Sequence, residues 1–301
     1  MYDLIVIGGG PAGLTSTMYA IRKRLNVLLV SKDLGGKTNY RLALPWVEDY
    51  KVIRGLEVVN KFQSELEYLK FARVLQTVER LEQRPDGFAV LTGEGDELLS
   101  RAIIVATGTR QKLLHVPGEK EFMMCGLCYS ATNYAPLFID RKAIVVGDGI
   151  LALRSTAELA TVARHVHLVD LGAQAHLLPL GKKLKEANNV TILEGYQVVQ
   201  VKGNRYAECL EVRAPDGHQE EIETDGIFVE MNLIPNSKMV RGLVELDEQG
   251  RIKVDCLSRT SVPGVFAAGD VTDIYAEQVL VAVGEGAKAA LSAYDYLLPM
   301  L

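Results

Sequence analysis

The residues of this chain with the clearest potential for chemistry are two cysteines, Cys125 and Cys128, which are separated by two residues. Two thiols at this spacing can close a small disulfide, and such pairs often contain one thiol with a lowered pKa that supplies a thiolate nucleophile. A zinc site would need two further ligands, but Cys209 and Cys256 are isolated in the sequence. The spacing therefore favours redox chemistry, with two unlinked structural cysteines as the alternative, and we expect no metal site.

Two glycine-rich turns are the second candidate for chemistry. The sequence Gly8-Gly-Gly-Pro-Ala-Gly13 follows a strand-like run and precedes a helix-period stretch, and Gly147-Asp-Gly149 repeats this arrangement. In each copy a second apolar strand follows, at residues 27–30 and 166–169. This order is typical of the βαβ unit in which the pyrophosphate of a dinucleotide lies at the helix N-terminus. The sequence therefore predicts two dinucleotide sites.

The first glycine turn has the residue types that a phosphate cradle needs. Gly8 permits a tight turn, Gly10 lets the backbone approach the phosphates, and Gly13 lets the helix pack closely on the strand. An acid that holds a ribose is expected about 20 residues further on. Ser31 takes that position instead, and Asp33 is the nearest acid. The loop is complete, whereas its ribose contact departs from the usual pattern.

The second copy carries an acid at the end of its second strand. Asp170 lies where a carboxylate can accept hydrogen bonds from a free ribose 2′-hydroxyl and would repel a 2′-phosphate. We therefore expect NADH to be favoured over NADPH, with a solvated acid at a strand end as the alternative. Asp148 places a further negative charge within the second turn.

Two further apolar strands end at glycine. Residues 103–105 lead into Ala106-Thr107-Gly108, and residues 265–268 lead into Gly269-Asp270, at the edge where open α/β sheets bind ligands. An acid after Gly269 can hydrogen-bond the ribityl hydroxyls of a flavin, or simply cap the following turn. Alternating stretches joined by Pro-Asp-Gly turns predict a small antiparallel meander in each copy. Together these patterns predict an α/β protein.

Composition excludes several classes of protein. With 301 residues, 48% of them hydrophobic, and 33 Lys+Arg against 38 Asp+Glu, the chain is expected to fold as two globular domains. The net charge of −5 argues against a general nucleic-acid or anionic-membrane surface. No apolar run approaches the roughly 18 residues that cross a bilayer. The N-terminus has no basic leader or cleavage site, so we expect a cytoplasmic protein without a secretory signal.

Over nearly its whole length, the sequence resembles the low-molecular-weight thioredoxin reductase family of flavoproteins. The resemblance lies in the first glycine turn, in Gly35-Gly36, in Ala106-Thr-Gly108, in the cysteine pair upstream of the second turn, and in the stretch 264–270, which extends through Gln278. It implies two Rossmann-like ββα nucleotide-binding domains, the second inserted into the first. It also implies a homodimer.

The resemblance further implies a domain layout and roles for several residues. The FAD-binding domain would comprise residues 1–114 and 243–301, and residues 115–242 would form an NAD(P)-binding-like domain that carries the cysteine pair. Asp270 would contact the ribityl and phosphate portion of the flavin cofactor. The backbone around Gln278-Val279 would face the flavin ring.

By the same resemblance, Cys128 would exchange electrons with the flavin, and Cys125 would attack the disulfide of a thioredoxin-like partner. The chain departs from the family where Tyr129 replaces an acid, Lys37 replaces a glutamine and Glu277 replaces an arginine. The residues that we expect to bind the cofactors are Gly8, Gly10, Pro11, Ala12, Gly13, Ser31, Gly36, Lys37, Ala106, Thr107, Gly108, Gly147, Gly149, Asp170, Gly269, Asp270, Gln278 and Val279.

Three functions are compatible with these residues. In the first, NADH, or less readily NADPH, reduces FAD, the flavin reduces the cysteine pair, and the dithiol reduces a thioredoxin-like protein. NADPH-dependent members of the family carry a basic cluster where this chain has residues 169–172, which again favours NADH. The second function dispenses with pyridine nucleotide: electrons come from ferredoxin, or a second FAD occupies the second site and thiols reduce flavin. The third is a non-catalytic redox sensor.

Overall fold

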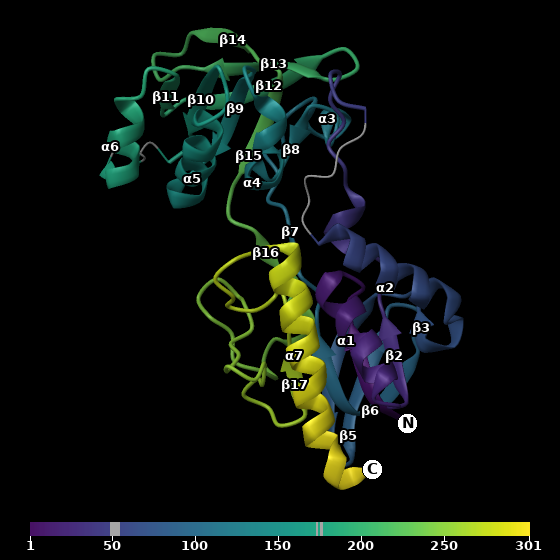
Figure 1. The fold of residues 1–301 in the computed structure, drawn as a ribbon. Coiled ribbons are helices and arrows are strands. Elements are labelled where there is room, and N and C mark those ends of the chain that lie inside the picture. Colours follow the sequence, from purple (N-terminus) through teal and green to yellow (C-terminus); the bar gives the residue numbers. More distant parts are fainter. Residues whose placement is uncertain (49–54, 173, 175–176) are drawn as a thin grey trace. The chain divides into compact units, whose positions relative to one another are not determined.

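Two parallel sheets organise the chain. The computed structural model describes residues 1–48, 55–172, 174 and 177–301. Contacts divide the chain into two compact units. Unit 1 comprises Met1–Asn39, Ile53–Arg110 and Ile234–Leu301, and unit 2 comprises Tyr40–Val52 and Gln111–Leu233. The α/β class that the sequence predicts is confirmed, with one parallel sheet at the centre of each unit (Figure 1).

Unit 1 is built on a sheet of seven strands in the order β3-β2-β1-β6-β5-β4, in which β17 also pairs with β6. Strands β1, β2, β3, β6 and β17 run parallel, and β4 and β5 form an antiparallel meander on β6. The elements of unit 1 are β1 (Tyr2–Ile7), α1 (Pro11–Arg22), β2 (Val27–Val30), η1 (Gly36–Asn39), α2 (Leu56–Tyr68), η2 (Lys70–Ala72), β3 (Arg73–Val74), β4 (Val78–Arg84), β5 (Gly87–Thr92), β6 (Glu97–Val105), β7 (Thr109–Arg110), β16 (Ile234–Pro235), η5 (Lys238–Val240), β17 (Val265–Ala267), α7 (Val279–Leu297) and η6 (Leu298–Met300).

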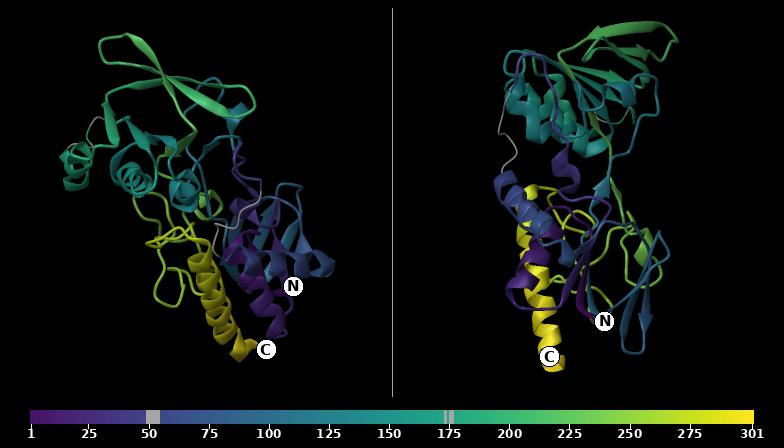
Figure 2. Two further views of the ribbon diagram at one scale, coloured as in Figure 1. Left: turned by 45° about the horizontal axis from the view of Figure 1, so that its top comes forward. Right: turned by 90° about the vertical axis from the view of Figure 1, so that its right-hand side faces the viewer.

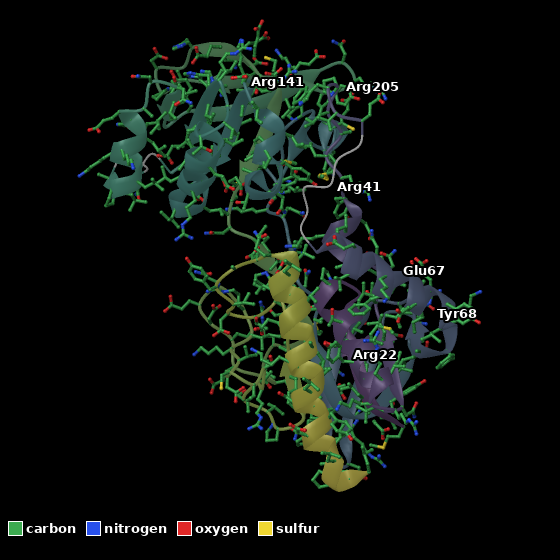
Figure 3. The ribbon with its side chains drawn as sticks, viewed as in Figure 1. Arg22, Arg41, Glu67, Tyr68, Arg141 and Arg205 are labelled. Carbon is green, nitrogen blue, oxygen red and sulfur yellow. The ribbon has the colours of Figure 1, made fainter. Side chains whose placement is uncertain are left out.

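Alternating side chains of the central strands cover both faces of this sheet. Leu4 and Val6 of β1 belong to the core under α1, α2 and α7, whereas Ile5 and Ile7 point to the opposite core. All four side chains are buried, as expected for a central parallel strand. At the outer end of α2, Tyr68 projects away from this core and is 86% exposed (Figure 3).

Helices α1 and α7 lie side by side against the sheet, although they come from opposite ends of the chain (Figures 1 and 2). The face of α7 that meets α1 contains small residues, among them Gly286. A Cβ atom at Gly286 would overlap the carbonyl oxygen of Ala12. The hydroxyl of Ser16 donates to the carbonyl of Gly286 at 2.9 Å. This close approach joins the first and last segments of the chain into one unit.

Unit 2 contains a five-stranded parallel sheet in the order β11-β10-β9-β15-β8 and a separate antiparallel sheet, β12-β13-β14. An apolar core lies between the two sheets, and α5 packs against β9 and β10. The elements of unit 2 are α3 (Glu119–Phe122), β8 (Leu127–Cys128), α4 (Ala131–Tyr134), η3 (Ala135–Phe138), β9 (Lys142–Gly147), α5 (Gly149–Ala160), β10 (His165–Asp170), α6 (Pro179–Lys185), β11 (Val190–Glu194), β12 (Gln197–Gly203), β13 (Ala207–Arg213), β14 (Gln219–Glu223) and β15 (Gly226–Glu230).

The unit boundaries differ from the domain boundaries expected from the sequence. Residues from Tyr40 onward group with unit 2, because the amide of Ala43 donates to the carbonyl of Met124 at 2.7 Å and the amide of Gly126 donates to the carbonyl of Ala43 at 3.1 Å. Residues from Ile234 onward group with unit 1, because β16 pairs with β7. Local sequence pattern does not report such tertiary pairing.

Trp46 supplies a second attachment of this early segment to unit 2. Its indole N–H donates to the carbonyl of Leu137 at 3.0 Å. Its ring meets Phe138 edge to face, with ring centroids 5.5 Å apart. The guanidinium of Arg141, labelled in Figure 3, lies 4.5 Å from the centroid of the Trp46 ring. A cation over the face of an indole adds to the stacking energy.

None of the described helices is long and apolar enough to span a membrane.

The contact between α1 and α7 gives a direct test of the fold. We expect Gly286→Ala to lower the free energy of unfolding by about 1–3 kcal/mol, because the added methyl group would push the two helices apart. The matched control is Gly284→Ala, since a Cβ atom there would meet no atom within 4 Å. That variant should keep or raise stability by up to about 1 kcal/mol, because alanine is the better helix former. Urea denaturation measures both, and equal midpoints for the two variants would contradict the packing described.

Candidate functional site

The turn between β1 and α1 has the form of an anion cradle. Gly8 has φ of +112°, and a side chain there would overlap the carbonyl of Ala106. Gly10 is the N-cap of α1, and no side chain caps this end of the helix. A Cβ atom at Gly10 would meet nothing within 4 Å. The free N–H groups and the positive end of the helix dipole therefore face open space, where they can hold phosphate.

The structure brings most of the expected FAD-binding residues of unit 1 together around this turn. A Cβ atom at Gly36 would lie 3.1 Å from the Cα atom of Gly10. A Cβ atom at Gly269 would lie 3.0 Å from the Cβ atom of Ala12 and 3.6 Å from that of Ala282 in the first turn of α7. Two helix N-termini, those of α1 and α7, therefore meet near the same glycine. Pro11 and Gly13 form the first turn of α1, while Gln278 is the N-cap of α7 and Val279 its first residue.

Ser31 shapes the glycine turn from beneath. Its hydroxyl oxygen accepts from the amide of Gly9 at 2.8 Å, and its hydrogen is donated to the carbonyl of Asp33 at 2.7 Å. A serine hydroxyl has a single hydrogen to donate. In this arrangement that hydrogen is used within the loop, so Ser31 supports the turn on which a dinucleotide would lie.

A charged cluster lies beside the first cradle. The ammonium of Lys37 is 2.6 Å from a carboxylate oxygen of Asp270 and 2.9 Å from the hydroxyl of Thr109. Burial raises the pKa of Glu277, and the charge of Asp270 adds to this rise, whereas Lys37 and Arg251 oppose it. The substitutions that set this chain apart from the family pattern, Lys37 and Glu277, thus belong to one electrostatic group with Asp270.

Two residues that sequence reasoning missed hold the loop at 106–108. The hydroxyl of Thr107 donates to the carbonyl of Asn236 at 2.8 Å, and the side-chain amide of Asn236 donates to the carbonyl of Thr107 at 2.9 Å. Thr109 binds Lys37 directly after Gly108. A hydroxyl directly after a strand-ending glycine is a signal that could have identified Thr109, whereas Asn236 is distant in sequence.

The second cradle lies at the carboxyl ends of β9 and β10. Asp148 is the N-cap of α5 without a side-chain hydrogen bond to that helix, and Gly149 has φ of +62° with no atom within 4 Å of a Cβ. Asp170 ends β10 opposite Gly147 and is 1% exposed. The amide of Gly172 donates to the carboxylate of Asp170 at 3.3 Å, and a Cβ atom there would lie 3.5 Å from that of Asp148. The carboxylate of Asp170 therefore lies beside the second glycine turn.

The cysteine pair has an environment that the spacing alone does not predict. Both residues are free thiols; Cys125 is half-buried and Cys128 is buried. Cys128 lies on β8, where its partner in the parallel ladder is Phe228 of β15. Burial raises the pKa of the Cys128 thiol far above its usual range, the amide of Ser130 opposes the rise, and the charge of Glu230 adds to it. The expected lowered thiol pKa is therefore wrong for Cys128, which is a neutral thiol near pH 7.

Tyr129, which stands where the family has an acid, is a structural hydrogen-bond donor. Its hydroxyl donates to Glu119 at 3.0 Å, and the same buried carboxylate accepts from the amides of Leu114 at 2.7 Å and His115 at 2.8 Å. Burial and the charge of Glu119 raise the pKa of Tyr129. Sequence reasoning missed Glu119, although an acid directly after the Pro117-Gly118 turn is a recognisable helix-start signal.

Glu230 is a second buried acid that the sequence analysis did not single out. It is 4% exposed, and one of its carboxylate oxygens accepts from the amide of Ala131 at 2.5 Å. An acid at the carboxyl end of an apolar strand, here β15, is the signal that could have identified it. In the part of the chain that the structure describes, no three His, Cys, Asp or Glu side chains cluster as metal ligands.

Comparison with known proteins gives a consistent family. Residues 2–286 match the family model described as "Pyridine nucleotide-disulphide oxidoreductase". The chain is 32% identical over 300 residues to "NADH dehydrogenase" of Bacillus subtilis (strain 168), covering 99% of this chain and 59% of the relative. It is 33% identical over 308 residues to a component of the alkyl hydroperoxide reductase of Pseudomonas putida, covering 99% and 58%. The chain thus spans less than two thirds of the length of these curated relatives.

Solved structures agree with this placement over the whole length of both chains. Thioredoxin reductase from Streptococcus pyogenes MGAS5005 superposes with a TM-score of 0.87 at 30% identity, covering 99% of each chain. Thioredoxin reductase from Giardia duodenalis gives a TM-score of 0.84 at 26% identity, again covering 99% of each chain. The family implies FAD and a nicotinamide nucleotide as cofactors. The chain therefore belongs to the pyridine nucleotide-disulphide oxidoreductase family, as an oxidoreductase with the fold of the low-molecular-weight thioredoxin reductases.

Proposed function

We propose that this chain is an FAD-dependent oxidoreductase that takes its electrons from NADH. The observation that carries the proposal is the position of Asp170, whose carboxylate lies beside the second glycine turn, with Gly172 donating to it at 3.3 Å. A carboxylate at this place accepts hydrogen bonds from a ribose 2′-hydroxyl. The name "NADH dehydrogenase" of the Bacillus subtilis relative supports the same donor.

The residues of unit 1 fit FAD. The uncapped N-terminus of α1 and the open space at Gly10 suit the pyrophosphate. By resemblance to the family, Asp270 would hold the ribityl portion, and the backbone at Gln278 and Val279 would face the ring. When bound, FAD supplies a two-electron acceptor for the hydride of the nicotinamide. The protein's part is to hold the cofactor in a fixed orientation and to set its electrostatic surroundings.

The charge of Asp170 is large enough to select the donor. Two unit charges about 4 Å apart interact by about 4 kcal/mol at an effective dielectric near 20. A 2′-phosphate beside Asp170 would be repelled, and Asp148 at the same turn adds to the repulsion. A second FAD is the alternative occupant of this site, because its adenosine ribose also carries a free 2′-hydroxyl. Reduction by ferredoxin would need no nucleotide there at all.

Disulfide exchange through Cys125 and Cys128 is the second candidate function. It is favoured by the half-exposed position of Cys125, by the two free thiols, and by the likeness to thioredoxin reductase from Streptococcus pyogenes. In this reaction the dithiol would give two electrons and two protons to the disulfide of a thioredoxin-like partner and would itself become a disulfide. Because Cys128 is buried and protonated, exchange requires β8 to open. A homodimer and a cytoplasmic location stay predictions.

The donor is tested by anaerobic reduction of the bound flavin. We expect NADH to bleach the flavin about tenfold or more faster than NADPH at equal concentration, because Asp170 repels the extra phosphate. Asp170→Asn, which keeps the shape but removes the charge, should narrow this preference. Glu194→Gln is the matched control, because Glu194 pairs with Asp170 in the ladder but binds Lys185 at 2.6 Å.

Equal rates with both nucleotides in the unmodified protein would overturn the NADH proposal. Two flavins per chain, or bleaching by reduced ferredoxin alone, would select the nucleotide-independent alternatives. Counting FAD per chain from its absorbance, before any donor is added, separates these cases.

The burial of Cys128 predicts its reactivity toward a thiol reagent. At pH 8 we expect Cys128 to react about a hundredfold or more slowly than Cys256, which is exposed, because its pKa is raised and its sulfur is covered. Mass spectrometry after timed alkylation assigns the rate to each cysteine. Urea below the unfolding transition should speed labelling of Cys128 and leave Cys256 unaffected. Fast labelling of Cys128 in the folded protein would show that β8 is open in solution.

Disulfide exchange is tested by single substitutions of the pair. Under this candidate function, Cys125→Ser and Cys128→Ser each reduce the steady-state reduction of a thioredoxin disulfide to background, since neither remaining thiol can complete the exchange. Cys256→Ser is the control and keeps full activity. Reduction of the thioredoxin that survives Cys125→Ser would contradict the role of the pair.

A further inference from the structure

We propose that Lys37 is an FAD-binding residue that neutralises Asp270 at the mouth of the first cradle. The inference rests on the proposed function, because it assumes that the cradle of unit 1 holds FAD. The ammonium of Lys37 lies 2.6 Å from Asp270 and 2.9 Å from Thr109, so two partners fix its position. All three residues belong to unit 1.

The ion pair lies where an anionic cofactor would enter. Lys37 is in η1, directly after Gly36, whose backbone approaches Gly10 at the N-cap of α1. Asp270 directly follows Gly269, whose backbone approaches Ala12 in the first turn of the same helix. Both charged residues therefore flank the helix end that is suited to a diphosphate.

The electrostatics of this cradle require a cation. Asp270 has a side chain only 14% exposed, so its charge is poorly screened by water. Left alone, it would repel the diphosphate that α1 attracts. Glu277 cannot offset it, and Arg251 is engaged by Asp247 at 2.7 Å. Lys37 is in direct contact with Asp270 and cancels its charge while leaving a carboxylate that can still accept a hydrogen bond.

This role differs from that of an ordinary surface ion pair. Exposed pairs contribute about 0–1 kcal/mol because water screens both charges. Here the acid is mostly buried, and the lysine has a second hydrogen-bond partner in Thr109. Charge-assisted hydrogen bonds of this kind are about twice as strong as neutral ones. The expected effect of removing Lys37 is therefore on FAD affinity rather than on folding.

The test is a fluorescence titration of the FAD-free protein with FAD. Lys37→Gln should raise the dissociation constant of FAD about tenfold, and Lys37→Arg should keep it within about threefold, because the charge is retained. Lys288→Gln is the matched control: its side chain is 34% exposed against 36% for Lys37, and it binds Glu285 at 2.9 Å on α7. We expect this control to bind FAD as tightly as the unmodified protein.

A double-mutant cycle with Asp270→Asn identifies the mechanism. If Lys37 acts by neutralising Asp270, Lys37→Gln should cost less than about threefold in the Asp270→Asn background. The tenfold effect should also shrink as salt is raised, because salt screens the repulsion between Asp270 and the diphosphate. An unchanged cost in that background would overturn the neutralising role.

Failure of the inference is distinguishable from failure of the proposed function. Lys37→Gln that binds FAD within twofold of the unmodified protein would overturn the role of Lys37 and leave the FAD site intact. An unmodified protein that does not bind FAD would overturn both.

Discussion

The close approach of α1 and α7 is the constraint on which the site in unit 1 depends. It is possible because Gly286 has no side chain to collide with the carbonyl of Ala12. The contact brings both helix N-termini to Gly269, so the free N–H groups of α1 and α7 point into one region. That concentration of positive partial charge suits a dinucleotide. It also explains why an acid such as Asp270 can be accommodated there when Lys37 is paired with it.

The two units repeat one plan with different charges. In each, a glycine turn follows a buried parallel strand and opens a helix whose first turn no side chain caps. In unit 1 the acid near the turn is paired with a lysine, so the surroundings of the turn are close to neutral. In unit 2, Asp148 and Asp170 both lie at the turn. The same backbone is therefore suited to different ligands, and the side chains at the strand ends select among them.

Much of this architecture could be predicted from the sequence, because βαβ units have strong local patterns. The glycine turns, the strands around them and the position of Asp170 all lie where the pattern places them. The attachment of residues around Ala43 to the loop at Met124 could not be predicted, since it depends on backbone pairing between distant segments. Nor could the ion pair of Lys37, which requires Asp270 to be brought 2.6 Å away by the fold.

The cysteine pair shows why spacing is a weaker guide than environment. A Cys-x-x-Cys sequence states that two thiols are near in the chain, but thiolate formation depends on solvation and neighbouring charge. Cys128 lies in a ladder with Phe228, and Glu230 lies close enough to raise its pKa further. Any oxidation of this thiol must first repay the cost of exposing and deprotonating it. The opening of β8, rather than the two-residue spacing, is therefore the step that controls whether the pair can carry electrons.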